Sequence, residues 1–313
     1  MKKETKKFTD ECLAGLKRAQ QLRPEIIAGK SRTIEGTLVA YNELLTSASA
    51  TNALAGLMSE VHPDEAIRDA ARECEQDVSR FYSDLALDRD MYDALAAVDV
   101  SSADPDTKRF LEHTLRDYRR AGVDKPVEVR DRLKQIDEEL TKLGQQFSKN
   151  ISEDMRAIEI KDAARLAGLP ADFIASHQPD ANGVIRITTD YPDYNPFMMY
   201  ADDDGLRREL YVKFRSRGDK DNEHILAQVL QLRAEKAMLL GYANYADYIT
   251  EDKMIKSGKA AGDFIERVAK LAKKRAAKDY TELLKELKTI DPKAKLVEDW
   301  QKTFLEERVK KKN

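Results

Sequence analysis

The sequence predicts a mainly α-helical protein with a small β element between two helical blocks. Long stretches carry apolar residues at spacings of three and four, which is the period of an amphipathic helix. Only 13 of the 313 residues are glycine and 9 are proline, which favours helices over sandwiches and barrels. The β element is indicated by the β-forming run 184–189, which follows a tight-turn signal at Asn182-Gly183.

The composition excludes several classes of protein. The hydrophobic fraction is 42%, which suffices for a core in a chain of this length. Lys and Arg number 54 and Asp and Glu number 57, so the net charge is −3, which argues against a nucleic-acid partner. No apolar run approaches the roughly 18 residues of a membrane span, so we expect no membrane partner. The expected location is the cytoplasm, with a periplasmic or exported protein as the alternative if a signal peptide has been removed.

Residues 1–155 are expected to form an N-terminal helical domain. Thr9-Asp10 and Thr33 are candidate caps for its first two helices. The segment 63–65, Pro-Asp-Glu, and the pair Asp104-Pro105 are expected to begin two more, because proline suits a first turn and carboxylates favour the positive end of the helix dipole.

The longest predicted helix begins near Pro126. Its apolar residues follow nearly a heptad pattern, and charged residues fill the other faces: Val129, Leu133, Ile136, Leu140, Leu143, Phe147 and Ile151. We expect this helix to pack inside its own chain. A coiled coil between two chains is the alternative.

Residues 156–313 are expected to form the first part of a second helical domain. A short strand is predicted at 157–160, followed by a brief helix that holds Phe173 and Ile174, and then by the β-forming run 184–189. From Asp202 the chain is expected to be helical again to its end.

Cys12 and Cys74 are the only cysteines, and both fall at apolar positions of helical patterns. Two cysteines are too few for a disulfide scaffold, and no clustered ligands accompany them. We therefore expect two reduced thiols in the core.

Residues for a known catalytic chemistry are missing from the sequence. A zinc peptidase motif, HExxH, needs two histidines four residues apart, and His62, His113, His177 and His224 contain no such pair. Neither GxSxG nor GxGxxG occurs, and Gly258-Lys259 is not part of a phosphate loop. The acidic triplet 202–204 is expected to begin a helix rather than to bind a cation. We therefore expect no catalytic, cofactor-binding or metal-binding residue in this chain.

Four segments carry a family resemblance. They are DTKRFLEHTLRDYRRAGVDKP at 106–126, LPADFIASH at 169–177, the stretch 187–218, and LRAEKAMLLGYANYADYITEDKM at 232–254. In this order and spacing they resemble the N-terminal portion of thimet oligopeptidase-like zinc metallopeptidases, the group that includes oligopeptidase A, neurolysin and oligopeptidase F types.

The resemblance implies a fold and a function. The family consists of largely helical, clam-like enzymes that cleave short peptides in a channel between two halves. Their zinc lies in the C-terminal half, on a helix with HExxH, and no position of this chain matches that motif. We therefore expect the N-terminal, non-catalytic part of such an enzyme, which supplies one wall of the channel and is inactive alone. Its expected partners are a C-terminal peptidase half, which alone would hold zinc, and short peptides.

The last residues of the chain support the same expectation. Trp300, Phe304, Leu305 and Val309 still mark an apolar helical face shortly before Asn313. We expect this face to be exposed and to pack against the C-terminal half. The alternative function is a free-standing helical binding or scaffold protein derived from the family, and a third is an unrelated helical protein.

Overall fold

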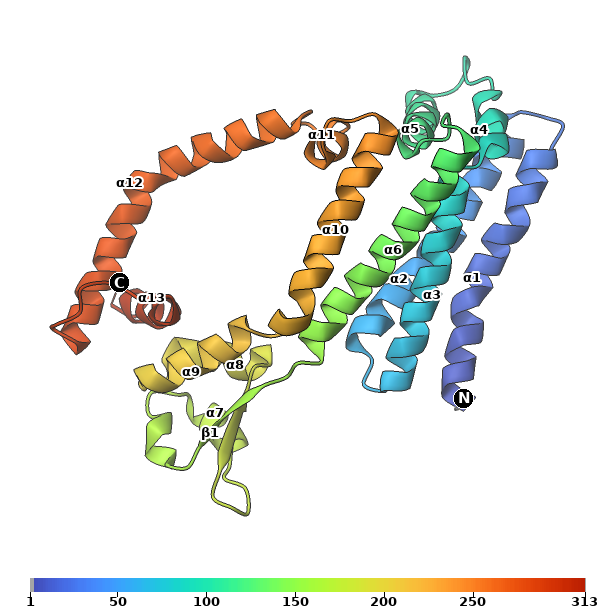
Figure 1. Ribbon diagram of the computed structural model, residues 1–313. Helices are drawn as coiled ribbons and strands as arrows, with labels where there is room; N and C mark the ends of the chain where they lie inside the picture. Colours follow the sequence, from blue (N-terminus) through green and yellow to red (C-terminus); the bar gives the residue numbers. More distant parts are fainter. Residues whose placement is uncertain (1–2, 313) are drawn as a thin grey trace. The chain divides into compact units, whose positions relative to one another are not determined.

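The computed structural model describes residues 3–312 and is mainly α-helical, which confirms the predicted fold class (Figure 1). The contacts divide the chain into two compact units, each made of two stretches of sequence. Unit 1 comprises the residues up to 146 together with 227–248. Unit 2 comprises 147–226 together with the residues from 249 onward.

Unit 1 is a group of helices in which α1, α2 and α3 pack directly against one another. Its elements are α1 (Lys3–Ala28), the π-helix η1 (Ile34–Val39), α2 (Ala40–Val61), α3 (Glu65–Ala86), α4 (Arg89–Ala96), α5 (Pro105–Ala121), most of α6 (Val127–Ser152), most of α10 (Asp219–Leu240) and the start of α11 (Tyr245–Thr250).

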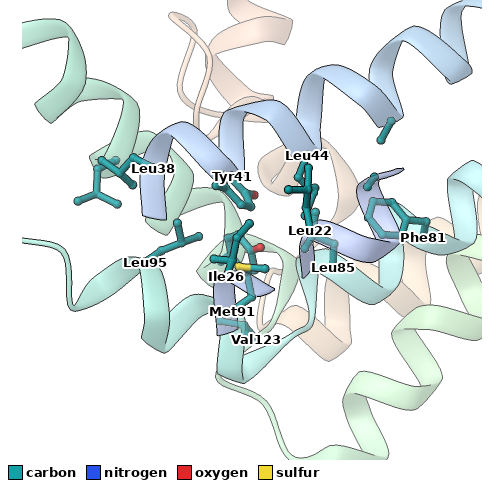
Figure 2. Packing of buried hydrophobic residues seen from close by; sticks show 14 of the residues in the cluster. Leu22, Ile26, Leu38, Tyr41, Leu44, Phe81, Leu85, Met91, Leu95 and Val123 are labelled. Carbon is teal, nitrogen blue, oxygen red and sulfur yellow. The ribbon is translucent and has the colours of Figure 1, made fainter. Parts of the chain in front are cut away.

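The core of unit 1 lies where α1 to α5 meet (Figure 2). Large apolar side chains from different helices fill it and are almost fully buried: Leu22, Ile26, Leu38, Tyr41, Leu44, Phe81, Leu85, Met91 and Leu95. Burial of such side chains stabilises the fold by about 1.5–3 kcal/mol each. The helices are therefore held mainly by this shared apolar contact rather than by their individual propensities.

Most of the predicted helix starts in unit 1 are confirmed. The Thr33 hydroxyl accepts a hydrogen bond from the Gly36 amide at the start of η1. Asp104 caps α5, with Pro105 as its first residue. The prediction for Thr9-Asp10 was wrong, because α1 already begins at Lys3 and the Thr9 hydroxyl donates to the carbonyl of Thr5 within the helix.

The predicted long helix is α6, and it packs inside its own chain. Its Leu133 and Ile136 side chains are buried. Its polar side chains bond to α3: the Ser79 and Thr141 hydroxyls lie 2.7 Å apart, and the Gln76 amide donates to Gln145 at 2.7 Å. The period of the apolar residues therefore predicted both the helix and its buried side.

Unit 2 contains the predicted small β element. Strands β1 (Ala157–Ile160) and β2 (Ile185–Thr188) pair antiparallel, with Ala157 opposite Thr188. The remaining elements are η2 (Ala163–Leu166), α7 (Ala171–Ser176), α8 (Tyr191–Tyr200), α9 (Asp204–Arg215), α12 (Gly258–Ile290), η3 (Asp299–Gln301) and α13 (Lys302–Lys310). The core below the sheet is formed by alternate strand residues and by α8 and α9: Ile158, Ile160, Ile185, Ile187, Phe197, Leu206 and Leu210.

The prediction of an exposed apolar face at residues 300–309 was wrong. Phe304 and Leu305 are buried and pack against the end of α12, chiefly at Leu287. The Trp300 indole is half-buried and donates a hydrogen bond to Asp204 at 3.1 Å. Helix α13 therefore folds back onto α12, and its apolar side is already covered within unit 2.

A buried arginine connects the two stretches of sequence that make up unit 2. Arg207 is 3% exposed, and its guanidinium lies 3.9 Å from the centroid of the Phe304 ring. It donates to the carbonyl of Ala201 and, at 2.7 Å, to the carboxylate of Asp204. A lysine could replace the charge but not this planar set of contacts.

We predict that Arg207→Lys lowers the free energy of unfolding of unit 2 by about 2 kcal/mol, the cost of leaving buried hydrogen-bonding groups unpaired. The exposed Arg215 of α9 provides the control Arg215→Lys. Trp300 is the only tryptophan, so its fluorescence during urea unfolding reports on unit 2. Equal midpoints for the two variants would contradict the role assigned to Arg207.

The expectation of two reduced thiols was also wrong. Cys12 of α1 and Cys74 of α3 form a disulfide with their Cα atoms 6.6 Å apart. Both residues are buried beside Ala55. The apolar faces that the sequence indicated do meet, but periodicity alone does not show which two side chains will stand opposite each other.

We predict that the double variant Cys12→Ser, Cys74→Ser is about 4 kcal/mol less stable than the oxidised protein, the loop-entropy value for cysteines 62 residues apart. Circular dichroism during urea unfolding measures this difference. The wild-type chain in reductant should unfold close to the variant. Two titratable thiols in the denatured, unreduced protein would contradict the disulfide.

Candidate functional site

The four histidines lie far apart along the chain and on different elements. His62 follows α2, and its Nδ1 accepts a hydrogen bond from the Asp64 amide at 3.1 Å. His113 lies on α5 and His224 on α10. Among residues 3–312, no group of three or more His, Cys, Asp or Glu side chains is arranged to hold a metal ion. No helix in the same range combines the length and apolar character needed to cross a bilayer.

His177 has a structural environment at the end of α7. Its ring stacks on Phe173 at 4.1 Å, and its Nδ1 lies 2.8 Å from the Phe173 carbonyl. Its Nε2 lies 3.0 Å from the carboxylate of Asp193, which also accepts from the amide and hydroxyl of Thr188. These contacts tie α7, β2 and α8 together.

The acidic triplet begins α9, as predicted. The Asp203 carboxylate caps the helix by accepting from the Leu206 amide at 2.9 Å. Asp204 accepts from Arg207 and Trp300. In unit 2 these carboxylates therefore serve as a helix cap and as hydrogen-bond acceptors for Arg207 and Trp300.

The segment 232–254 lies on α10 and α11 and faces α6 within unit 1 up to residue 248. The Arg132 guanidinium donates twice to the Glu235 carboxylate, at 2.6 and 2.8 Å. These hydrogen bonds raise the pKa of Arg132 and lower the pKa of Glu235, so both remain charged. One residue further along, the Lys236 ammonium pairs with Asp137.

Aromatic rings gather where α10 ends. Gly241 terminates the helix with a φ of 93°, and Asn244 caps α11 by accepting from the Asp247 amide. The ring of Tyr248 then lies 5.2 Å from that of Tyr242 and 5.8 Å from that of Tyr245. Burial raises the pKa of the Tyr248 phenol, which therefore stays neutral.

The glycine that follows α5 allows α6 and α10 to pack closely beside the end of that helix. Gly122 has a φ of 103° and follows the last turn of α5. A Cβ atom there would lie 2.8 Å from Leu133 and 2.9 Å from Leu240, which is too close for real carbon atoms. Both the backbone conformation and the space therefore require glycine where α5, α6 and α10 meet.

A groove of about 610 Å³ opens among these helices. It lies entirely within unit 1, and its walls come from α2, α3, the end of α5, α6, α10 and α11. Its polar lining residues are Asn52, Ser79, Tyr82, Ser83, Asp137, Thr141, Arg233, Lys236, Tyr245 and Tyr248. The volume is within the usual range of small-ligand sites.

A second candidate surface lies on α12 in unit 2 (Figure 1). Every residue from 262 to 278 is exposed. On this part of the helix Phe264, Ile265, Val268 and Leu271 form an apolar stripe, with Ile265 65% and Leu271 75% exposed. A solvent-facing helix side is ordinarily polar, and contiguous exposed apolar residues are typical of an interaction surface.

Both surfaces include residues that the sequence indicated without assigning a binding role. Arg233, Tyr245 and Tyr248 belong to the segment 232–254, which carries the family resemblance. The three-four spacing on 258–290 could have identified the stripe, but not that it stays uncovered. The uncovered apolar surface is on α12 and not, as expected, at Trp300, Phe304 and Leu305.

Comparison with known proteins identifies relatives. The sequence model of peptidase family M3 matches residues 197–313. Thimet-like oligopeptidase of Dictyostelium discoideum is 28% identical over 298 residues, which cover 92% of this chain and 43% of that protein. Oligopeptidase A of Salmonella typhimurium is 32% identical over 190 residues, 56% of this chain and 28% of that protein.

A third relative is the organellar oligopeptidase A of Arabidopsis thaliana, which is 30% identical over 265 residues, 78% of this chain and 33% of that protein. The chain therefore spans less than half the length of these curated relatives. The matches confirm the resemblance to thimet oligopeptidase-like peptidases, and the segment 232–254 falls inside the part that matches family M3.

The neighbours of Asp193 favour the charged form of its carboxylate. Burial raises the pKa of Asp193, but the hydrogen bonds from Thr188 and His177 outweigh it and hold the pKa below its ordinary value. The stabilisation is therefore complete above the ordinary aspartate pKa of about 3.9 and is lost as the pH falls through the lower folded value.

We predict that Asp193→Asn lowers the urea midpoint of unit 2 at neutral pH and weakens its decline toward about pH 3. Trp300 fluorescence follows the unfolding. Asp172→Asn, at an exposed position of α7, is the control and should leave the decline unchanged. An Asp193→Asn variant with the wild-type decline would show that this carboxylate does not stabilise the fold.

Proposed function

We propose that this chain is the N-terminal, non-catalytic part of a zinc-dependent oligopeptidase. It supplies one wall of the channel that holds short peptides, and it does not cleave them alone. The chemistry comes from a C-terminal peptidase part that carries the HExxH motif. That motif would hold zinc and activate water for attack on the peptide bond.

The similarity to oligopeptidases is the observation that carries this proposal. The relatives are named oligopeptidases, and the chain aligns with 28–43% of their length. The sequence itself contains no pair of histidines four residues apart. A related chain without the metal motif can contribute binding surface but no metal-activated water.

The apolar stripe on α12 supports the need for a partner. Ile265, Val268 and Leu271 are exposed on a helix whose far end is covered by α13. Burying apolar surface contributes roughly 25 cal/mol per Å², so the stripe favours association with another apolar surface. We assign it to the C-terminal peptidase part as the docking surface.

The proposal includes the cellular compartment of the protein. The cytoplasm was expected from the sequence, with export as the alternative. Disulfides persist in oxidising compartments and are rare in the cytosol. The Cys12–Cys74 disulfide therefore favours the exported alternative.

Reconstitution tests the proposal. The chain is co-expressed with a C-terminal M3 peptidase part from the same organism, and cleavage of a short quenched peptide is measured with and without zinc. We predict zinc-dependent cleavage by the pair and none by the chain alone. Replacing the HExxH glutamate of the partner should abolish cleavage, because the general base is then lost.

Variants on α12 make the test specific. The double variant Ile265→Asp, Leu271→Asp should abolish co-purification and cleavage. Lys270→Asp, on the opposite side of the helix at 100° per residue, should retain both. A pair that associates and cleaves normally despite the double variant would contradict the docking surface. No cleavage by any pair, with a monodisperse chain that binds no hydrophobic dye, would favour the free-standing binding protein.

A further inference from the structure

We propose that the groove of unit 1 binds the free α-carboxylate of a short peptide, with Arg233 as its counter-ion. The choice of a peptide as the ligand rests on the proposed function. Recognition of a carboxylate rests on the groove itself, whose lining combines one uncommitted cation with phenol groups.

Helix α10 brings two positive side chains, Arg233 and Lys236, to the lining of the groove. Lys236 is paired with Asp137, which also lines the groove. Arg233 makes no ion pair or hydrogen bond with any residue from 3 to 312, although it lines the same groove. Its guanidinium presents parallel N–H donors that match the two oxygens of a carboxylate.

The position of Arg233 is set by an aromatic ring. Its guanidinium carbon lies 5.3 Å from the centroid of the Tyr245 ring, within the range of a cation–π contact. Such a contact holds the guanidinium over the groove without using its N–H groups. An incoming carboxylate can therefore accept from them at little cost in side-chain entropy.

Phenols complete the polar lining. Tyr82, Tyr245 and Tyr248 all line the groove, and within the described chain none of their hydroxyls makes a hydrogen bond. Because burial raises the pKa of Tyr248, its phenol keeps the proton that it can donate to an oxygen of the ligand. The faces of the rings offer an apolar wall for the side chain next to the carboxylate.

The charge balance selects one end of the peptide. The ionisable groups that carry charge in the lining are Arg233, Lys236 and Asp137, which sum to one positive charge. A peptide amino terminus is positive and would be repelled by this balance, whereas a carboxyl terminus is attracted. The groove therefore favours the carboxyl end over the amino end.

A matched pair of ligands tests the proposal on the full chain. Acetyl-Ala-Ala-Phe is titrated with its carboxyl terminus free and, separately, as the carboxamide, by calorimetry or ligand-observed NMR. We predict that the acid binds about tenfold more tightly than the amide, as one charge-assisted hydrogen-bonded pair provides. Arg233→Gln should reduce this preference to about one, and Arg233→Lys should keep part of it.

The control is Arg109→Gln, which removes an exposed arginine of α5 that does not line the groove. It should leave the preference for the acid intact. Equal binding of acid and amide by the wild-type chain, a preference that survives Arg233→Gln, or no binding of either peptide at millimolar concentration would each overturn the proposal. None of these results depends on a peptidase partner. Conversely, failed reconstitution with intact preference for the acid would overturn only the proposed function.

Discussion

Two ion pairs between α6 and α10 set the geometry on which the groove depends. Arg132 pairs with Glu235 and Asp137 with Lys236, and the partners are 103 and 99 residues apart in sequence. Burial of Leu133 and Leu240 beside these pairs fixes the two helices at close range. Because Asp137 neutralises Lys236, Arg233 remains as the cation of the groove lining that can bind an external ligand.

The two units use their polar residues in different ways. In unit 2, several charged side chains pair with one another. The segment 202–204 caps α9 and binds Arg207, and Glu286 forms ion pairs with Arg308 and Lys312. The apolar stripe that stays exposed in unit 2 lies on α12. Unit 1 has a densely packed core with the Cys12–Cys74 disulfide. Within residues 3–312, the side chains of Arg233 and of the three tyrosines that line the groove make no hydrogen bond. The proposed function uses both surfaces, the stripe on α12 for association with a partner and the groove for binding a ligand.

The sequence predicted the local structure far better than the long-range contacts. The strand 157–160 and the caps at Thr33 and Asp104 follow from residue chemistry within a few positions, and all are confirmed. The Cys12–Cys74 disulfide and the groove were missed, because each depends on helices separated by dozens of residues. The cover over Phe304 was missed for the same reason, since no periodicity shows which neighbour a face will meet.

In the proposed function, a C-terminal peptidase part covers the apolar stripe on α12. Hydrogen–deuterium exchange of this chain, alone and together with that partner, measures how strongly the backbone amides of each segment are protected. We expect exchange to slow across 262–272 on association, while the disulfide-linked α1 and α3 keep their exchange rates. Unchanged exchange across 262–272 in a complex that forms would contradict the claim.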